Sequence, residues 1–317
     1  MESPIFILGC ERSGTTLLRL MLNQSPVLYI PGESGFLDKL RKQQELYGDF
    51  TQPYQRWFFI RDLQTSKATS TTYSFPIFKL TIEEAEMALA ETAPTNYPGA
   101  ASALFQAAAR KQGKQYWGDK TPRYIFKISW LAEAFPQAKF IHVIRDGRDV
   151  ASSLIKAGWV NNFVKAAYYW HEKVEAGISS GKTLDKQRYY ELNYEQLVMY
   201  PEETLKDLCN WLELEYVPSM LQQNENATNY ISGDWHLHEM VAKPVDSSRA
   251  YAWKQQLSPR QVADFESVAG ELLEELGYEV TGAKVPFYLI TTRSLMEKLK
   301  SNLRSNAPTI LRQLGLK

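Results

Sequence analysis

Residues Pro4–Leu22 read PIFILGCERSGTTLLRLML, and they carry the strongest fold signal in the chain. The apolar run Ile5–Leu8 is typical of a buried strand, and the apolar residues from Leu17 onward recur at helical spacing. The polar turn Gly9–Thr16 between them contains a second glycine, Gly14. Backbone N–H groups of such a turn, followed by a helix N-terminus, form a site for an anionic group. This segment therefore predicts a phosphate-binding loop between a strand and a helix.

The turn differs from the P-loop of nucleoside triphosphatases in one respect. In a P-loop, the pattern G-x4-G is followed by a lysine that reaches the β- and γ-phosphates. Here Thr15 follows the second glycine, and Arg12 supplies the positive charge from inside the turn. The missing lysine disfavours a kinase and favours a different phosphorylated anhydride. A P-loop-like kinase and a catalytically inactive nucleotide-binding module are the two alternatives to an enzyme acting on that anhydride.

A second segment, Phe140–Ser153, repeats the order of the first. It reads FIHVIRDGRDVASS, which is an apolar strand, a charged turn with a glycine, and the start of a helix. Two such units predict an α/β fold of the P-loop type, with a central parallel sheet between two layers of helices. In such folds the ligand binds at the carboxyl ends of the strands. His142 lies inside the apolar strand, so we expect it to be a core residue.

Composition limits the class of protein. The chain has 317 residues, of which 44% are hydrophobic, enough for the core of one large domain. Its two cysteines, Cys10 and Cys209, favour a reducing compartment over a disulfide framework. No apolar run approaches the ~20 residues of a membrane span. The first strand begins too early to leave room for a signal peptide, so we expect a cytoplasmic location.

Charge is unevenly distributed along the chain. The whole sequence has 36 basic and 36 acidic residues, whereas residues 281–317 contain seven basic residues and one glutamate. No basic groove is evident in the remainder, which disfavours nucleic acid as a partner. Leu295, Leu299 and Leu303 predict an amphipathic helix within 281–317. This basic C-terminal helical extension either contacts an anionic membrane surface peripherally or packs against protein.

Residues 37–80 and 224–256 are the segments with the weakest pattern. The first is rich in aromatic residues, such as Tyr54, Trp57 and Phe58. Short helices and loops of this kind form either a lid over an acceptor site or a satellite hydrophobic cluster. The second is polar, contains Gly233 and Pro244, and predicts a long ordered loop.

Taken together, the chain resembles the sulfotransferases that use 3′-phosphoadenosine 5′-phosphosulfate (PAPS), most closely the branch of tyrosylprotein and many bacterial sulfotransferases. The matching stretches are Gly9–Leu22, Gly32-Glu33, Asp119-Lys120-Thr121-Pro122, Phe140–Ser153, Tyr194–Pro201 and Lys243-Pro244-Val245. The resemblance implies a sulfotransferase domain over 1–280, with 37–80 and 224–256 as insertions that cover the acceptor or the nucleotide. It also implies in-line transfer of a sulfuryl group from PAPS to an acceptor hydroxyl, with no metal required.

The resemblance assigns nucleotide-binding roles to nine residues. The cradle for the 5′-phosphosulfate would consist of Arg12, Ser13, Gly14, Thr15 and Thr16. The 3′-phosphate would be held by Arg145 and Ser153, the adenine would lie near Tyr194, and Lys243 would add a further contact. The alternative for Arg145 is a structural ion pair with Asp146 or Asp149. The sequence also departs from the family, which has an arginine near positions 156 and 157, where this chain has Lys156 and Ala157.

Three residues match catalytic positions of the family. Glu33 matches the general base that takes the proton from the acceptor hydroxyl. Lys120 matches the lysine that stabilises the leaving oxygen, a task that Arg12 would share. His236 or His238 is the alternative base. The acceptor class remains open among carbohydrate, lipid, small molecule and peptide.

Overall fold

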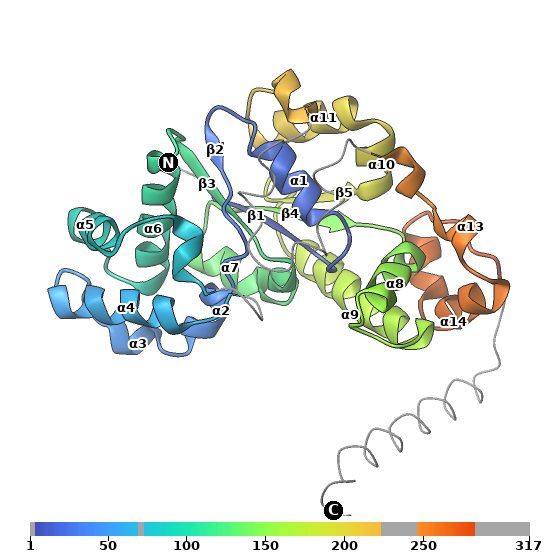
Figure 1. Cartoon of the computed structure of the whole chain (residues 1–317), viewed down its shortest axis with the longest axis horizontal. Coiled ribbons are helices and arrows are strands. Elements are labelled where there is room, and N and C mark those ends of the chain that lie inside the picture. Colours follow the sequence, from blue (N-terminus) through green and yellow to red (C-terminus); the bar gives the residue numbers. More distant parts are fainter. Residues whose placement is uncertain (1–3, 69–72, 223–245, 283–317) are drawn as a thin grey trace, which may run out of the picture.

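The predicted parallel sheet is confirmed by the computed structural model, which describes residues 4–68, 73–222 and 246–282. Its five strands all run parallel and lie in the order β2-β3-β1-β4-β5 (Figure 1). The strands are β1 (Ile5–Gly9), β2 (Leu28–Tyr29), β3 (Tyr116–Lys120), β4 (Lys139–Ile144) and β5 (Tyr189–Asn193). Every residue of the central strand β1 is buried, as its uninterrupted apolar run predicted.

Strand register brings three distant segments to one edge of the sheet. Lys120 at the end of β3 is paired with Ile7 of β1, and Gly9 of β1 is paired with Val143 of β4. The loop after β1, the turn after β3 and the turn after β4 therefore all leave the sheet at its carboxyl edge. This is the edge where ligands bind in folds of this type.

Alternation along the strands divides the core into two layers. Ile5 and Ile7 face one side, together with apolar residues of three helices and one 3-10 helix. These are α1 (Thr15–Leu22), α10 (Tyr194–Met199), α11 (Pro201–Leu212) and η3 (Pro218–Leu221). Phe6 and Leu8 belong to the cluster on the other side. The elements on that side are η2 (Pro122–Lys127), α7 (Ile128–Ala134) and α9 (Phe163–Gly181). The α/β/α layering is thus as predicted.

His142 is a core residue, as predicted. It is fully buried in β4 and packs against Gly177 of α9. Its Nδ1 shares a hydrogen bond of 2.7 Å with the hydroxyl of Tyr189. Burial lowers the pKa of His142 to about 3 because the charged imidazolium is poorly solvated there. This histidine stays neutral and has no part in a proton relay at the carboxyl edge.

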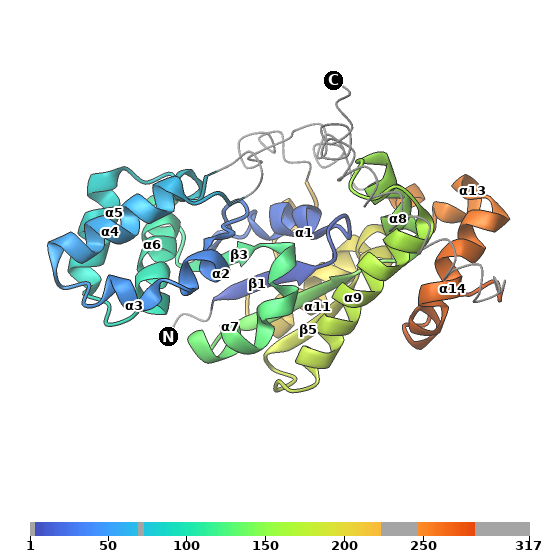
Figure 2. The same cartoon turned by 90° about the horizontal axis from the view of Figure 1, so that it is seen from below.

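A group of helices extends the molecule at the β2 end of the sheet (Figure 2). It comprises α2 (Phe36–Arg41), α3 (Gln44–Tyr47), α4 (Pro53–Thr65), η1 (Phe75–Phe78), α5 (Ile82–Thr92) and α6 (Tyr97–Lys111). Phe36, Phe59 and Phe78 belong to the same hydrophobic cluster as Phe6 of β1. Phe59 and Phe78 of the aromatic 37–80 segment are therefore continuous with the main core, which disagrees with a separate satellite cluster, one of the two interpretations of this segment.

The C-terminal described residues pack at the opposite end of the sheet. Two helices, α8 (Gly147–Lys156) and α14 (Pro259–Glu275), enclose the third apolar cluster together with α9. Between residues 246 and 256 lie η6 (Ser247–Arg249) and α13 (Trp253–Gln256), where one continuous loop had been predicted. The rest of that predicted loop and the helix predicted within 281–317 lie outside the described residues. Within the described ranges, no helix is long and apolar enough to span a membrane.

Candidate active site

The turn after β1 has the backbone of an anion-binding loop. Gly9, Arg12 and Gly14 have φ values of 149°, 71° and 96°, and the Ser13 N–H donates to the Cys10 carbonyl at 3.2 Å. Gly14 is the N-cap of α1 and no side chain caps the helix. The first N–H groups of α1 are therefore available to a ligand. A Cβ at Gly14 would lie 2.3 Å from the ring of Tyr194, so no larger residue fits there.

Arg12 links this loop to the second strand–turn–helix unit. Its Nε donates a hydrogen bond of 2.9 Å to Ser153 Oγ on α8, 141 residues along the chain. Burial lowers the pKa of the Arg12 guanidinium, and the nearby charges of Arg145 and Arg249 lower it further. Three guanidinium groups therefore gather at the loop. Like charges are brought together at this cost where an anion neutralises them.

Arg145 leaves the end of β4 and turns toward the loop. Its guanidinium donates to the carbonyls of Arg12 at 3.2 Å and Arg249 at 3.1 Å, and lies 4.3 Å from the ring centroid of Tyr194. Its contact with Asp149 is long, at 3.9 Å. Among the described residues, the buried Nε of Arg145 has no hydrogen-bond partner. A buried unpaired donor is costly, so this atom is suited to an anionic ligand.

The alternative role of Arg145, an ion pair with Asp146 or Asp149, is met only by the 3.9 Å contact with Asp149, and Asp146 is not its partner. Asp146 instead binds Arg148, whose Nη2 and Nε donate to the two carboxylate oxygens at 2.7 Å and 2.9 Å. Arg148 also donates to Glu266 of α14 at 2.8 Å and stacks 3.6 Å from the ring centroid of Trp253. The two arginines of the R-D-G-R segment, Arg145 and Arg148, thus lie in different environments. Arg145 faces the loop, and Arg148 is fully buried.

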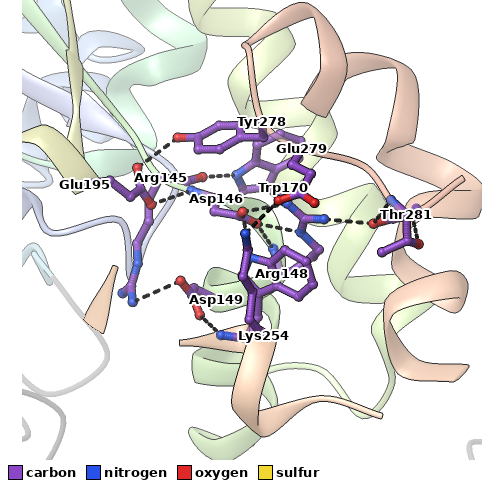
Figure 3. Close-up of polar contacts among 12 residues, drawn as sticks. Arg145, Asp146, Arg148, Asp149, Trp170, Glu195, Lys254, Tyr278, Glu279 and Thr281 are labelled. Atoms are coloured by element: carbon purple, nitrogen blue, oxygen red, sulfur yellow. Dashed lines mark hydrogen bonds and ion pairs between the residues drawn. The ribbon is translucent and has the colours of Figure 1, made fainter. Parts of the chain in front are cut away.

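Glu195 ties this buried network to β4 from the other side. One of its carboxylate oxygens accepts from the Asp146 N–H at 3.0 Å, and the other accepts from the Tyr278 hydroxyl at 3.0 Å (Figure 3). Glu195 directly follows Tyr194, and Asp146 directly follows Arg145. The Glu195–Asp146 contact therefore fixes the backbone beside Tyr194 and Arg145, whose side chains stack on each other.

Glu33 and Lys120, the predicted base and leaving-oxygen stabiliser, are brought together. The Lys120 ammonium lies 2.6 Å from a Glu33 carboxylate oxygen, with side chains 4% and 30% exposed. Burial lowers the pKa of Lys120, Glu33 opposes this shift, and the charge of Arg19 adds to it. The pair lies at the carboxyl edge of β3, next to the β1 loop. A partly exposed carboxylate beside a buried cation can meet a substrate that enters from solvent.

A family model matches more than half of the chain, beginning at the Pro4–Leu22 segment. A model of the sulfotransferase family matches residues 4–218. The chain belongs to the sulfotransferase family. It is accordingly an enzyme that transfers sulfuryl groups, as predicted, and this membership disagrees with the kinase alternative.

The relatives of this sulfotransferase have low sequence identity to it, but they align with most of its length. Protein-tyrosine sulfotransferase A of Caenorhabditis elegans is 24% identical over 87% of this chain and 67% of its own length. The omega-hydroxy-beta-dihydromenaquinone-9 sulfotransferase of Mycobacterium bovis is 28% identical over 74% of this chain and 70% of its own length. The sulfotransferase domain of the Synechococcus PCC 7002 olefin synthase superposes with a TM-score of 0.62. That superposition, at 24% identity, covers 88% of this chain and 97% of the domain, and it shows a shared fold.

The structure adds one candidate site residue that the sequence did not reveal. Arg249 in η6 lies close enough for its charge to act on Arg12 and Tyr194. Its carbonyl accepts from Arg145. Residues around Arg249 form no recognisable pattern, so only the packing of η6 against α10 places it there. Three predicted residues of the sulfotransferase, Lys243, His236 and His238, lie outside the described residues.

Stability of the sulfotransferase should depend on pH through Glu195. This side chain is fully buried, and burial raises its pKa from an ordinary 4.5 to about 7. Between these values the folded state holds a proton that the unfolded state has lost, so stability falls as pH rises from about 4.5 to about 7. The wild type should lose free energy of unfolding between pH 5 and pH 8, and we expect Glu195→Gln to make this loss smaller by about 2–3 kcal/mol.

Urea titrations at the two pH values measure this difference. Glu271→Gln, on the exposed surface of α14, is the matched control and should leave the pH dependence as in the wild type. An equal slope in the wild type and in Glu195→Gln would show that Glu195 is ionised in the folded protein over this range.

Proposed function

We propose that this sulfotransferase takes its sulfuryl group from PAPS and passes it to an acceptor hydroxyl. The observation that carries the proposal is the contact between two candidate anion sites. One is the β1 loop, which includes Arg12, with the N-terminus of α1, and the other is formed by Arg145 and Ser153, which are both hydrogen-bonded to Arg12. A nucleotide with anionic groups at both its 5′ and 3′ positions suits this pair of sites.

Several local features fit that nucleotide. Ser13 Oγ and Arg145 Nε are buried and, within the described residues, have no hydrogen-bond partner. Thr15 and Thr16 open α1 and are buried beside the loop. In this proposal, Arg12 to Thr16 hold the 5′-phosphosulfate, Arg145 and Ser153 hold the 3′-phosphate, and Tyr194 lies near the adenine. Arg249 adds positive charge on the 3′ side.

In this proposal Glu33 is the base and Lys120 stabilises the leaving oxygen, and their contact at 2.6 Å supports neighbouring roles for the two side chains. The acceptor oxygen forms a bond to sulfur while the bond from sulfur to the bridging phosphate oxygen breaks, and the acceptor proton passes to Glu33. Lys120 and Arg12 stabilise the negative charge that grows on the bridging oxygen. Adenosine 3′,5′-bisphosphate is released. Within the described residues, no three histidine, cysteine, aspartate or glutamate side chains are grouped to hold a metal ion.

Names of the relatives support a hydroxyl as the acceptor. One is named for protein tyrosine and another for an omega-hydroxy menaquinone, and both of these groups carry a hydroxyl. We infer a hydroxyl-bearing acceptor for this chain as well. A screen of peptide, lipid, carbohydrate and small-molecule acceptors with labelled PAPS tests this assignment. A chain that binds the nucleotide but transfers to none of them would be a nucleotide-binding module.

Nucleotide binding tests the proposed site directly. We expect calorimetry to show tighter binding of adenosine 3′,5′-bisphosphate than of adenosine 5′-monophosphate, because Arg145 meets the 3′-phosphate. Arg145→Ala should weaken binding of the bisphosphate by about 10- to 150-fold, which corresponds to the free energy of one charge-assisted hydrogen bond. The monophosphate should be nearly unaffected.

Two further titrations control this result. Arg110→Ala, on the exposed surface of α6, should bind the bisphosphate like the wild type. Arg249→Ala should weaken it in the same direction as Arg145→Ala. If Arg145→Ala weakened binding of both nucleotides equally, the 3′-phosphate would lie elsewhere. If the wild type bound ATP tightly and did not bind the bisphosphate, the proposed donor would be contradicted.

A further inference from the structure

Four buried polar side chains lie directly behind Glu33 and Lys120. They are Ser34, Asp119, Thr121 and Tyr124, with exposed fractions of 0%, 0%, 1% and 1%. We call these four residues the hydroxyl clip. The sequence pattern gave them no role, and the roles proposed above do not use them. Buried polar groups are retained where they are hydrogen-bonded and where their positions matter.

The hydroxyl clip joins the segments that carry the two candidate catalytic groups. Ser34 directly follows Glu33, and Thr121 directly follows Lys120. The backbone N–H of Ser34 donates to Thr121 Oγ1 at 3.1 Å. The two segments, 87 residues apart in sequence, are thus connected at two adjacent residue pairs, Ser34–Thr121 and Glu33–Lys120. Two adjacent connections fix both the distance and the orientation of one segment relative to the other.

Each hydroxyl of the clip is oriented by a second partner. Thr121 has one hydroxyl hydrogen, and it donates this hydrogen to Asp119 Oδ1 at 2.6 Å. Its lone pairs are then left for the Ser34 N–H. On the other side, the Ser34 hydroxyl shares a hydrogen bond of 3.1 Å with Tyr124, whose hydroxyl accepts from the Leu37 N–H at 2.9 Å. The turn that presents Glu33 is therefore held at Ser34 and again at the start of α2.

We propose that the hydroxyl clip positions Glu33 for proton transfer, with Thr121 as the principal positioning residue. This inference rests on the proposed function, in which Glu33 is the base and Lys120 binds the leaving oxygen. When Lys120 turns to that oxygen, its ion pair with Glu33 weakens, and the clip then holds the Glu33 turn in place. The clip acts through Glu33 and does not itself touch the reacting atoms. Loss of the clip should therefore slow sulfuryl transfer without weakening nucleotide binding.

Thr121→Val tests the clip because valine keeps the shape of threonine and removes only its hydroxyl. We expect kcat for transfer from PAPS to fall by about 10- to 100-fold, since small errors in the placement of a reacting group are costly. The Kd of adenosine 3′,5′-bisphosphate should stay within about twofold of the wild type. Thr121→Ser restores the hydroxyl and should recover kcat to within about threefold, which a loss of packing alone would not do.

Tyr124→Phe removes the hydroxyl on the other side of Ser34 and gives a second, independent measurement. It should also lower kcat with unchanged bisphosphate affinity. Tyr189→Phe is its matched control, because it removes a phenol hydroxyl that bonds His142 at the amino end of β5, away from Glu33. We expect Tyr189→Phe to keep the wild-type kcat, and thermal unfolding verifies that each variant is folded.

Glu33→Gln in the same assay separates failure of the clip from failure of the proposed function. If the wild type transfers sulfuryl from PAPS and Glu33→Gln is slow, a wild-type kcat in both Thr121→Val and Tyr124→Phe overturns the clip alone. An equal loss in Thr121→Ser and Thr121→Val, or a bisphosphate Kd that weakens together with kcat, also overturns it. Full activity of Glu33→Gln removes the proposed base and, with it, the clip.

Discussion

We expect Glu33→Gln to slow sulfuryl transfer by about 10²–10⁴-fold while nucleotide affinity is unchanged. The substitution keeps the size of the side chain and an oxygen that can face Lys120, but an amide cannot accept the acceptor proton. The Glu33 side chain is 30% exposed and lies 2.6 Å from Lys120, and it is not among the residues proposed to bind the nucleotide. Single-turnover transfer from PAPS and calorimetry with adenosine 3′,5′-bisphosphate measure the two effects separately.

A second lysine–glutamate pair provides the control for Glu33→Gln. Glu213 lies 2.8 Å from Lys139, with its side chain 84% exposed, far along the chain from the β3 turn. Glu213→Gln should transfer at the wild-type rate. A wild-type rate in Glu33→Gln would contradict the assignment of the base and would direct attention to His236 and His238, the alternative bases that the sequence offers.

The second large effect concerns stability. We expect Arg148→Met to lower the free energy of unfolding by about 3–5 kcal/mol, because it leaves two buried carboxylates without their cation. Arg148 is fully buried, with Asp146 at 2.7 Å and Glu266 at 2.8 Å. Methionine fills much of the volume but carries no charge. Urea unfolding followed by circular dichroism measures the change.

A surface arginine shows what an ordinary ion pair contributes. Arg61 lies 3.0 Å from Asp62, its side chain is 45% exposed, and it also stacks on Trp57 and Phe58. We expect Arg61→Met to cost about 1 kcal/mol or less, since solvent screens exposed pairs. Equal losses in the two variants would mean that the Asp146–Arg148–Glu266 network contributes no more than a surface pair.

The buried network also links the C-terminal region to the proposed nucleotide site. The Trp253 N–H donates to Asp149 at 2.8 Å, and its indole donates to Asp146 at 2.8 Å. Trp253 follows Arg249 by four residues, so these bonds hold η6 and α13 against α8. The carbonyl that Arg145 binds and the charge of Arg249 both depend on this docking. We therefore expect the surviving folded fraction of Arg148→Met to bind the bisphosphate more weakly.

Local pattern was sufficient to predict the fold and the position of the candidate loop within it. The apolar run Ile5–Leu8, the glycines of the turn and the helical spacing after Leu17 specify a strand, a loop and a helix, and the structure has all three. The repeat of that order at Phe140–Ser153 predicted the parallel sheet. The contact between Arg12 and Ser153 agrees with the predicted convergence of the two units. The strand, loop and helix of each unit were accessible because they depend on neighbours within about ten residues along the chain, whereas the Arg12–Ser153 contact spans 141 residues.

Other properties of the site were decided only by the tertiary structure. Strand register sets Lys120 beside Glu33 and Thr121 beside Ser34, and register depends on pairing across more than 80 residues. Two arginines three positions apart received opposite environments because α14 covers one and the β1 loop meets the other. The place of Arg249 depends on the docking of η6. Sequence thus determined which loop has the form of an anion-binding turn, while packing between distant segments determined which charges face that loop and which are buried.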